Sequence, residues 1–330
     1  MDFLYTEWLT KPLWMWLSFM GIVVALLTLD LGVLHKKQRE IEVKESLVMS
    51  AFYIALGLAF GGWVWWYMGE TAGMNYITGF VVEKSLAMDN VFVIAMIFTY
   101  FGVPRLYQHR VLFWGILGVI VLRAIMIGFG AAAVQEWGWV LYLFAAFLIF
   151  TGVKMLLFAD KEYDVSANPM LKLVRRRFRV TDELHDEKFW VQKTDPKTGK
   201  PAWFMTPLML ALLMVEIVDV VFAVDSVPAI FAITTDPFIV YTSNIFAILG
   251  LRALYFALAA MVNRFHYLKY ALAILLIFIG SKIFLADALG LAKIPPSVSL
   301  SITFAILAAG IGYSLWKTRG EPAVAVKPAE

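Results

Sequence analysis

The stretch at residues 204–232, FMTPLMLALLMVEIVDVVFAVDSVPAIFA, decides the fold. It is apolar almost throughout, and it exceeds the roughly 20 residues that a helix needs to cross the hydrocarbon core of a bilayer. It nevertheless contains the acids Glu216, Asp219 and Asp225. Ionisable residues inside a span are expensive and point to function. The stretch therefore predicts a membrane-spanning helix that carries a functional site.

The composition of the whole chain agrees with this interpretation. Its 330 residues are 61% hydrophobic and their mean hydropathy is +0.76, whereas soluble domains are about 45–50% apolar. We expect an all-α polytopic membrane protein that forms one integral membrane domain over residues 1–330. The chain has no cysteine, and its four histidines fall in polar connecting segments. Any metal within the spans would therefore need oxygen ligands.

About nine spans are predicted from the apolar segments. They lie at 12–34, 46–68, 76–100, 111–133, 137–158, 204–232, 238–261, 267–286 and 297–316. One long polar stretch, 159–203, separates the fifth span from the sixth. The tail at 320–330 is rich in Pro and Ala and is predicted to be disordered.

The basic residues of the connecting segments predict the orientation. On one side they gather in 35–45, 101–110, 159–203, 262–269 and the C-terminal tail, whereas the other side has only Lys11 and Lys293. Because cytoplasmic loops carry the excess of Lys and Arg, we expect the N-terminus outside. The C-terminus and the loop 159–203 are then cytoplasmic.

An internal repeat relates the third to fifth spans (about 76–158) to the sixth to eighth (about 204–286). Val82-Glu83 matches Val218-Asp219, Leu122-Arg123-Ala124 matches Leu251-Arg252-Ala253, and the segment 148–154 matches 276–282 in the same order. Since each unit has three helices, the second enters the membrane from the opposite side. This inverted repeat is typical of secondary transporters, which bind substrate between the repeats near the midplane. A duplication kept only for packing is the alternative.

Charged residues occur inside the predicted spans. The acids are Asp30, Glu83, Asp89, Glu216, Asp219 and Asp225, and the bases are Lys84, Arg123, Lys154, Arg252 and Lys282. Each charge at a helix centre costs about 2.5–3.5 kcal/mol on insertion scales, so pairing must offset most of the total. The acids outnumber the bases by one, and a proton or a bound cation can balance that charge.

Helical spacing predicts which polar groups share a face. Glu83 and Asn90 are seven residues apart, as are Asp219 and Ser226, so each pair lies on one face of its helix. Glu216 adds an oxygen group to the second face. The full set of predicted metal ligands is Glu83, Asp89, Asn90, Glu216, Asp219, Asp225 and Ser226.

These are hard oxygen ligands, which suit Mn²⁺, Mg²⁺ or Ca²⁺ and do not suit Zn²⁺ or Cu⁺. Pro228 cannot donate a hydrogen bond to the carbonyl of Val224, so a kink or break is expected there. Arg123 and Arg252 lie near mid-span. Each is either a structural partner of an acid, such as Glu83 or Asp219, or a mobile counter-charge that occupies the site when the ion leaves.

The segments 83–92, 222–231 and 242–252 resemble the TerC family of bacterial inner-membrane proteins, and most closely its Alx branch. The resemblance covers most of residues 12–315, and the predicted ligands match the family motif. It implies export of manganese or a related divalent metal from the cytoplasm across the inner membrane. Descriptions of the family also include tellurium resistance and redox modulation.

Four functions stay open on these grounds. The first is a secondary exporter of Mn²⁺ that exchanges it for protons. The others are a membrane-bound redox modulator, a scaffold that recruits partners through 159–203 in tellurium resistance, and an anion carrier. We expect no enzymatic activity, no tightly bound cofactor and no nucleic-acid partner. The expected partners are the divalent ion and the lipid bilayer, and the sequence does not give the oligomeric state.

Overall fold

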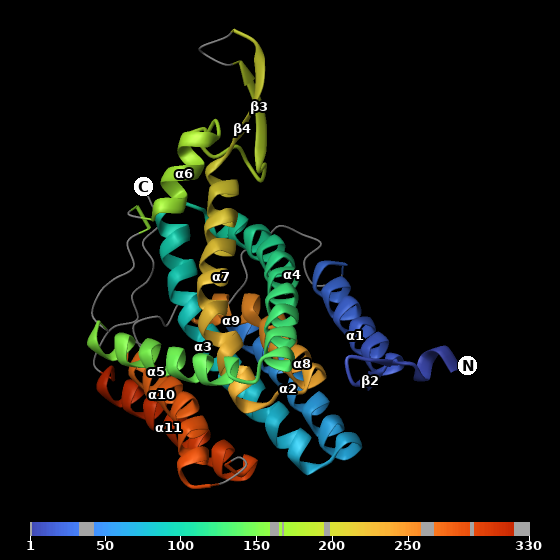
Figure 1. Ribbon diagram of the computed structural model, residues 1–330. Coiled ribbons are helices and arrows are strands. Elements are labelled where there is room, and N and C mark those ends of the chain that lie inside the picture. The colour runs from blue at the N-terminus through green and yellow to red at the C-terminus, as the bar shows by residue number, and fades with distance from the viewer. Residues whose placement is uncertain are drawn as a thin grey trace.

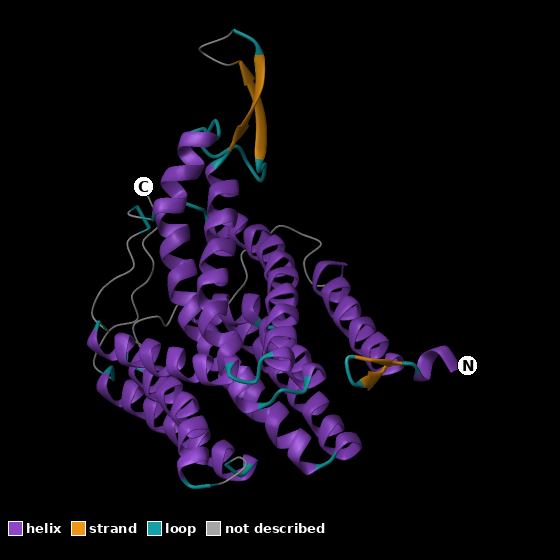
Figure 2. Ribbon diagram, in the orientation of Figure 1, coloured by secondary structure: helices purple, strands orange, loops and turns teal. Residues whose placement is uncertain are grey.

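The computed structural model describes residues 2–32, 43–158, 165–166, 168–194, 199–258, 267–290 and 294–319. The predicted disordered tail at 320–330 lies outside these residues, and so does the side chain of Asp30. The described part is predominantly helical (Figures 1 and 2). The all-α polytopic architecture is therefore confirmed.

The elements follow one another along the chain as a series of long helices with a few short strands. A 3₁₀ helix, Asp2–Tyr5, and the strands β1 (Glu7–Trp8) and β2 (Lys11–Pro12) precede α1 (Leu13–Gly32), α2 (Val43–Met68), α3 (Glu70–Tyr100), α4 (Arg105–Glu136) and α5 (Val140–Leu157). Then come α6 (Pro169–Arg177), β3 (Trp190–Thr194), β4 (Pro201–Met205), α7 (Pro207–Ile233), α8 (Pro237–Leu249), α9 (Leu251–Leu258), α10 (Leu268–Ala288) and α11 (Pro296–Lys317). The hairpin β3–β4 projects from one end of the molecule, beside the start of α7 (Figure 1).

Three helices begin at the same local signal, a polar capping residue followed directly by proline. The Thr206 side chain accepts a hydrogen bond from the Met209 N–H at 3.4 Å, and Asp236 accepts one from the Phe238 N–H at 3.0 Å. Asn168 caps α6 in the same way. Such caps satisfy otherwise unpaired N–H groups, and a proline at the first helical position needs no partner. The starts of α6, α7 and α8 are therefore fixed by local sequence.

The described part of the structure contains fewer helices suited to cross a membrane than the sequence predicted. Each predicted span coincides with a helix or with the α8–α9 pair, but among the described residues six helices are long and apolar enough to cross a membrane, or seven with that pair. The apolar part of α1 is short, Leu13–Leu29, and α3 carries Glu83, Lys84 and Asp89 in its interior. The predicted nine spans are thus not confirmed.

The helix break lies at a different place from the one expected. Pro228 is inside α7, which continues as one helix to Ile233. The break occurs instead at Gly250, where α8 and α9 meet at an angle of 41°. Gly250 is closely approached by Tyr53 and by the Lys84 ammonium, so a side chain there would displace one of them.

Helix packing brings the two predicted halves of the chain together. α3 packs against α7 and α8, α4 packs against α7, and α5 packs along α10. Apolar side chains of α3, α4, α7 and α9 form one core, and those of α5, α10 and α11 contribute to another. The polar residues described next lie where α3, α4 and α7 meet.

Candidate functional site: a buried arginine between two carboxylates

Arg123 of α4 is the centre of the candidate site, and it is only 1% exposed. It donates two hydrogen bonds to Asp219 of α7, from Nε to Oδ2 at 3.1 Å and from Nη2 to Oδ1 at 3.0 Å. Its Nη1 donates to Glu83 of α3 and to the hydroxyl of Ser226 at 3.0 Å. This fork-shaped contact is the geometry in which a guanidinium binds a carboxylate most strongly. One side chain therefore joins three helices.

The helical periodicity of α7 explains part of this arrangement. Asp219 and Ser226 are seven residues apart and reach the same guanidinium, so their predicted common face is confirmed. Glu83 and Asp219 are both buried, at 2% and 5% exposed. Two carboxylates facing one guanidinium leave one negative charge if both are ionised. A proton or a further cation would balance that charge.

Asp225 belongs to a different contact. It follows Asp219 by six residues and precedes Ser226 by one, so it points away from their shared face. Its Oδ1 accepts a hydrogen bond at 3.0 Å from the hydroxyl of Thr151 on α5. Asp225 is half-buried. The structure therefore places it between α7 and α5, apart from Arg123.

Glu216 lies one turn before Asp219 and faces α4 at Gly118. A Cβ atom at Gly118 would overlap the Glu216 carboxylate, so the bare glycine makes room for the acid. The Oε2 atom of Glu216 is buried and has no hydrogen-bond partner among the described residues. A buried acceptor without a partner costs about 1–3 kcal/mol. This carboxylate is thus available to a ligand.

The remaining predicted ligands on α3 are not joined to Arg123. Asn90 is buried, and its Oδ1 has no hydrogen-bond partner in the described part of the chain. Asp89 is half-buried. Within the described ranges, no three His, Asp or Glu side chains are close enough together to hold a metal ion. The predicted ligands therefore do not form a single preformed shell. Glu83, Asp219 and Ser226 meet at Arg123, and the others lie elsewhere.

Arg252, the predicted second counter-charge, is buried in α9, two residues after the break at Gly250. Lys84 of α3 also approaches this break, through a contact that the sequence did not predict. The buried ammonium of Lys84 donates a hydrogen bond at 3.0 Å to the carbonyl oxygen of Ala247, in the last turn of α8. A cation there is favourable, because the carbonyl end of a helix is its negative end.

Asn244 of α8 was also missed by the sequence analysis. It is fully buried, and neither its Oδ1 nor its Nδ2 has a hydrogen-bond partner among the described residues. The signal was present in the sequence, since Thr242, Ser243 and Asn244 form a polar run in the predicted span 238–261, whose one charged residue is Arg252. No acid lies beside Asn244 as Asp89 lies beside Asn90, so the acidic motifs did not point to it.

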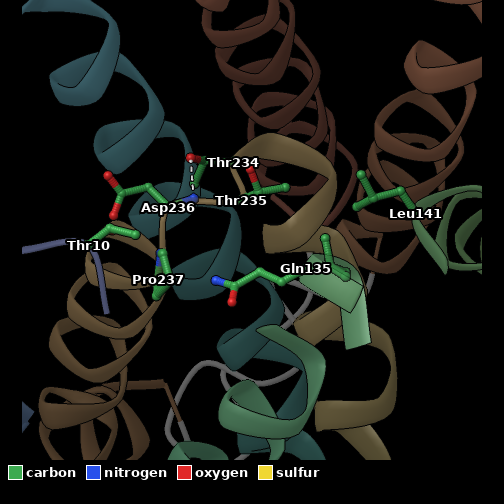
Figure 3. A pocket seen from close by; sticks show the side chains of 8 residues that line it. Thr10, Gln135, Leu141, Thr234, Thr235, Asp236 and Pro237 are labelled. Atoms are coloured by element: carbon green, nitrogen blue, oxygen red, sulfur yellow. Dashed lines mark hydrogen bonds between the residues drawn. The ribbon is translucent and has the colours of Figure 1, made fainter. Parts of the chain in front are cut away.

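A pocket of about 510 Å³ opens at the end of the molecule where α4 and α7 finish and α8 begins (Figure 3). Threonines, one glutamine and one acid supply its polar lining. These residues are Thr10, Gln135, Thr234, Thr235 and Asp236. Asp236 also forms an ion pair with Lys11 at 2.9 Å. The pocket is therefore an open hollow of mixed polar and apolar lining, and none of its lining residues is among those that contact Arg123.

The architecture and the buried charged cluster define a polytopic α-helical membrane protein. The chain matches the model of the integral membrane protein TerC family over residues 68–321. It belongs to the TerC family.

Relatives resemble this chain over nearly its full length. An uncharacterised membrane protein of Myxococcus xanthus is 47% identical over 308 residues, which cover 93% of this chain and 94% of the relative. The Alx proteins of Salmonella typhi and Escherichia coli, named as candidate membrane-bound redox modulators, are each 44% identical over 311 residues, covering 92% of this chain and 94% of theirs. A comparison with solved structures gives no match.

Proposed function

We propose that this protein is a secondary transporter that exports a hard divalent cation, with Mn²⁺ as the substrate, in exchange for protons. The observation that carries the proposal is the convergence of Glu83 and Asp219 on Arg123. The two acids occupy matching positions in the two predicted repeats, and they lie deep in the protein. Substrate sites of secondary transporters lie between such repeats.

Reciprocal packing of α5 and α10 supports the inverted repeat that the proposal requires. A Cβ atom on Gly152 of α5 would meet the Ala273 carbonyl oxygen at 2.6 Å, and one on Gly280 of α10 would meet the Ala145 carbonyl oxygen at 2.5 Å. The alignment that pairs Gly152 with Gly280 also pairs Ala145 with Ala273. This reciprocal pair of contacts is what an inverted repeat would produce, and it supports that part of the proposal.

Arg123 has a definite role in the proposed cycle. Its guanidinium now occupies the space between Glu83, Asp219 and Ser226, all of which have oxygen atoms suited to a hard cation. The metal would take the place of the guanidinium when the repeats rearrange. Arg123 would return when the metal leaves, as a mobile counter-charge. Arg252 is proposed for the same role on the second repeat.

The other predicted ligands would serve the path to and from this position. Asn90 and Glu216 each have a buried oxygen without a partner among the described residues, and Asp89 and Asp225 are half-buried. With the N-terminus outside the bacterial inner membrane and the C-terminus cytoplasmic, the pocket in Figure 3 would open to the outside. The proposed activity requires no enzymatic reaction and no tightly bound cofactor.

The test is transport by the purified full-length protein in liposomes that contain a Mn²⁺-sensitive dye, with an imposed pH gradient. We expect Asp219→Asn and Glu83→Gln to abolish Mn²⁺ transport. Glu183→Gln is the matched control, because its side chain is 83% exposed in the β3–β4 region. Mg²⁺ and Ca²⁺ are compared in the same assay. The proposal is wrong if the native protein moves no divalent ion, or if both variants transport at the native rate.

A redox role is the second candidate, because the Alx relatives carry that description in their names. This chain has no cysteine, so thiol chemistry is closed to it, and a redox role would need a bound chromophore or metal. An absorbance spectrum of the purified protein, before and after reduction, tests this directly.

A further inference from the structure

We infer that Asn244 is a neutral oxygen ligand of the transported cation, contributed by α8. This inference rests on the proposed function and extends its ligand set to a residue outside the acidic motifs. The observation behind it is an amide that is fully buried while both of its polar atoms lack hydrogen-bond partners among the described residues. Buried polar groups in native proteins nearly always have a partner. The working protein must therefore supply one.

Neighbouring contacts of α8 show which way Asn244 points. The Tyr241 hydroxyl donates to the Ala124 carbonyl oxygen of α4 at 2.7 Å, and Ser243 lies against Gly79 of α3. With 3.6 residues per turn, Asn244 is about 60° from Tyr241 and about 100° from Ser243 in the opposite sense. Its side chain is therefore directed between α3 and α4.

The same contacts fix its height along those helices. One turn beyond Asn244, the Ala247 carbonyl oxygen accepts from Lys84, the residue after Glu83. One turn before it, Val240 packs in one cluster with Ile127, which is one turn after Arg123. α4 ends at the pocket where α8 begins, so the two helices run in opposite directions. Asn244 thus lies between a contact to the residue after Glu83 and an apolar cluster that begins one turn from Arg123.

The chemistry of the amide fits this position. An asparagine oxygen is a normal ligand of Mg²⁺ and Ca²⁺ and suits Mn²⁺ for the same reason. Because it is neutral, it adds a ligand without adding negative charge. Transport requires binding that is weak enough to reverse, and a further neutral ligand beside the two carboxylates meets that requirement.

The experiment compares Asn244→Leu and Asn244→Asp with the native full-length protein in two measurements. One is Mn²⁺ transport in dye-loaded liposomes, and the other is the increase in melting temperature on adding Mn²⁺ to detergent-solubilised protein. Thr242→Val is the matched control, because Thr242 is equally buried on α8 while its hydroxyl bonds its own helix, to Phe238 O at 2.7 Å.

We expect Asn244→Leu to raise the Mn²⁺ concentration for half-maximal transport roughly tenfold or more, and to reduce the melting shift by Mn²⁺. Asn244→Asp, which keeps an oxygen, should retain the shift, and Thr242→Val should behave like the native protein. If Asn244→Leu matches the native protein in both measurements while Asp219→Asn does not transport, the inference about Asn244 is wrong and the proposed function stands. If the native protein shows neither transport nor a shift, both are overturned.

Discussion

Replacing Arg123 by methionine should destabilise the protein strongly. The arginine donates to four oxygen atoms, on Glu83, Asp219 and Ser226, and its side chain is 2% exposed. Methionine keeps much of the volume but leaves two buried carboxylates facing each other without a cation. Breaking a buried ion pair by removing one partner costs about 3–5 kcal/mol. We expect a loss of this size in the free energy of unfolding, measured by denaturant titration of the purified protein in detergent.

Two further variants test whether Arg123 stabilises the protein through its charge. The triple variant Arg123→Met, Glu83→Gln, Asp219→Asn removes all three charges, and replacing a buried ion cluster as a whole is often nearly neutral, so stability should largely return. Arg110→Met is the control, since its ion pair with Glu187 at 2.7 Å is 37% exposed on the arginine side and should contribute less than about 1 kcal/mol. A triple variant as unstable as the single one would show that Arg123 acts through packing and not through charge.

Two further predictions concern the packing of α5 against α10 and the hydrogen bond to Asp225. Gly152→Ala and Gly280→Ala should each lower the free energy of unfolding by about 1–3 kcal/mol, and by similar amounts, because the added methyl groups meet equivalent backbone oxygens at 2.6 and 2.5 Å. Denaturant titration measures this, and Gly62→Ala is the control because nothing lies near its added methyl group. A large loss at only one of the two sites would contradict the symmetry. Thr151→Val should cost about 1 kcal/mol by removing the 3.0 Å hydrogen bond to Asp225, and an unchanged stability would show that this contact contributes nothing.

The sequence predicted those features that depend on one helix at a time. Hydropathy located the six or seven helices that are long and apolar enough to cross a membrane among the described residues, because the bilayer imposes length and apolarity on each helix separately. Spacing of seven residues placed Asp219 and Ser226 on one face, and the hydrogen bonds of Arg123 confirm it. The predicted span 76–100 coincides with α3, but α3 is not among the helices that are apolar enough to cross a membrane, since its interior charges lower its apolarity.

Pairing of Arg123 with an acid of another helix was among the predicted alternatives and is found, but most features that depend on pairs of helices could not be predicted. Asp225 and Ser226 are adjacent in sequence, yet one contacts Thr151 of α5 and the other Arg123 of α4. No spacing rule within α7 reveals which neighbour lies on each side. The break at Gly250 was missed for a similar reason. Proline was the expected cause, whereas the break lies where Tyr53 and Lys84 crowd the backbone of another helix.

Charge counting connects the buried cluster to the proposed exchange with protons. Glu83, Asp219 and Arg123 together carry one net negative charge when both acids are ionised, and one proton makes the cluster neutral. A divalent cation bound to both carboxylates is neutral as well, but only if the guanidinium has withdrawn. The displaced arginine would then need another carboxylate, and Glu216, one turn from Asp219 with an oxygen that has no partner in the described part of the chain, is the acid that we propose for it. Counted with Glu216, the four groups carry two net negative charges when all three acids are ionised, and either two protons or one divalent cation neutralises them. A cycle that alternates between these two neutral arrangements exchanges one metal ion for two protons, since any other pairing leaves an uncompensated charge in a low-dielectric interior.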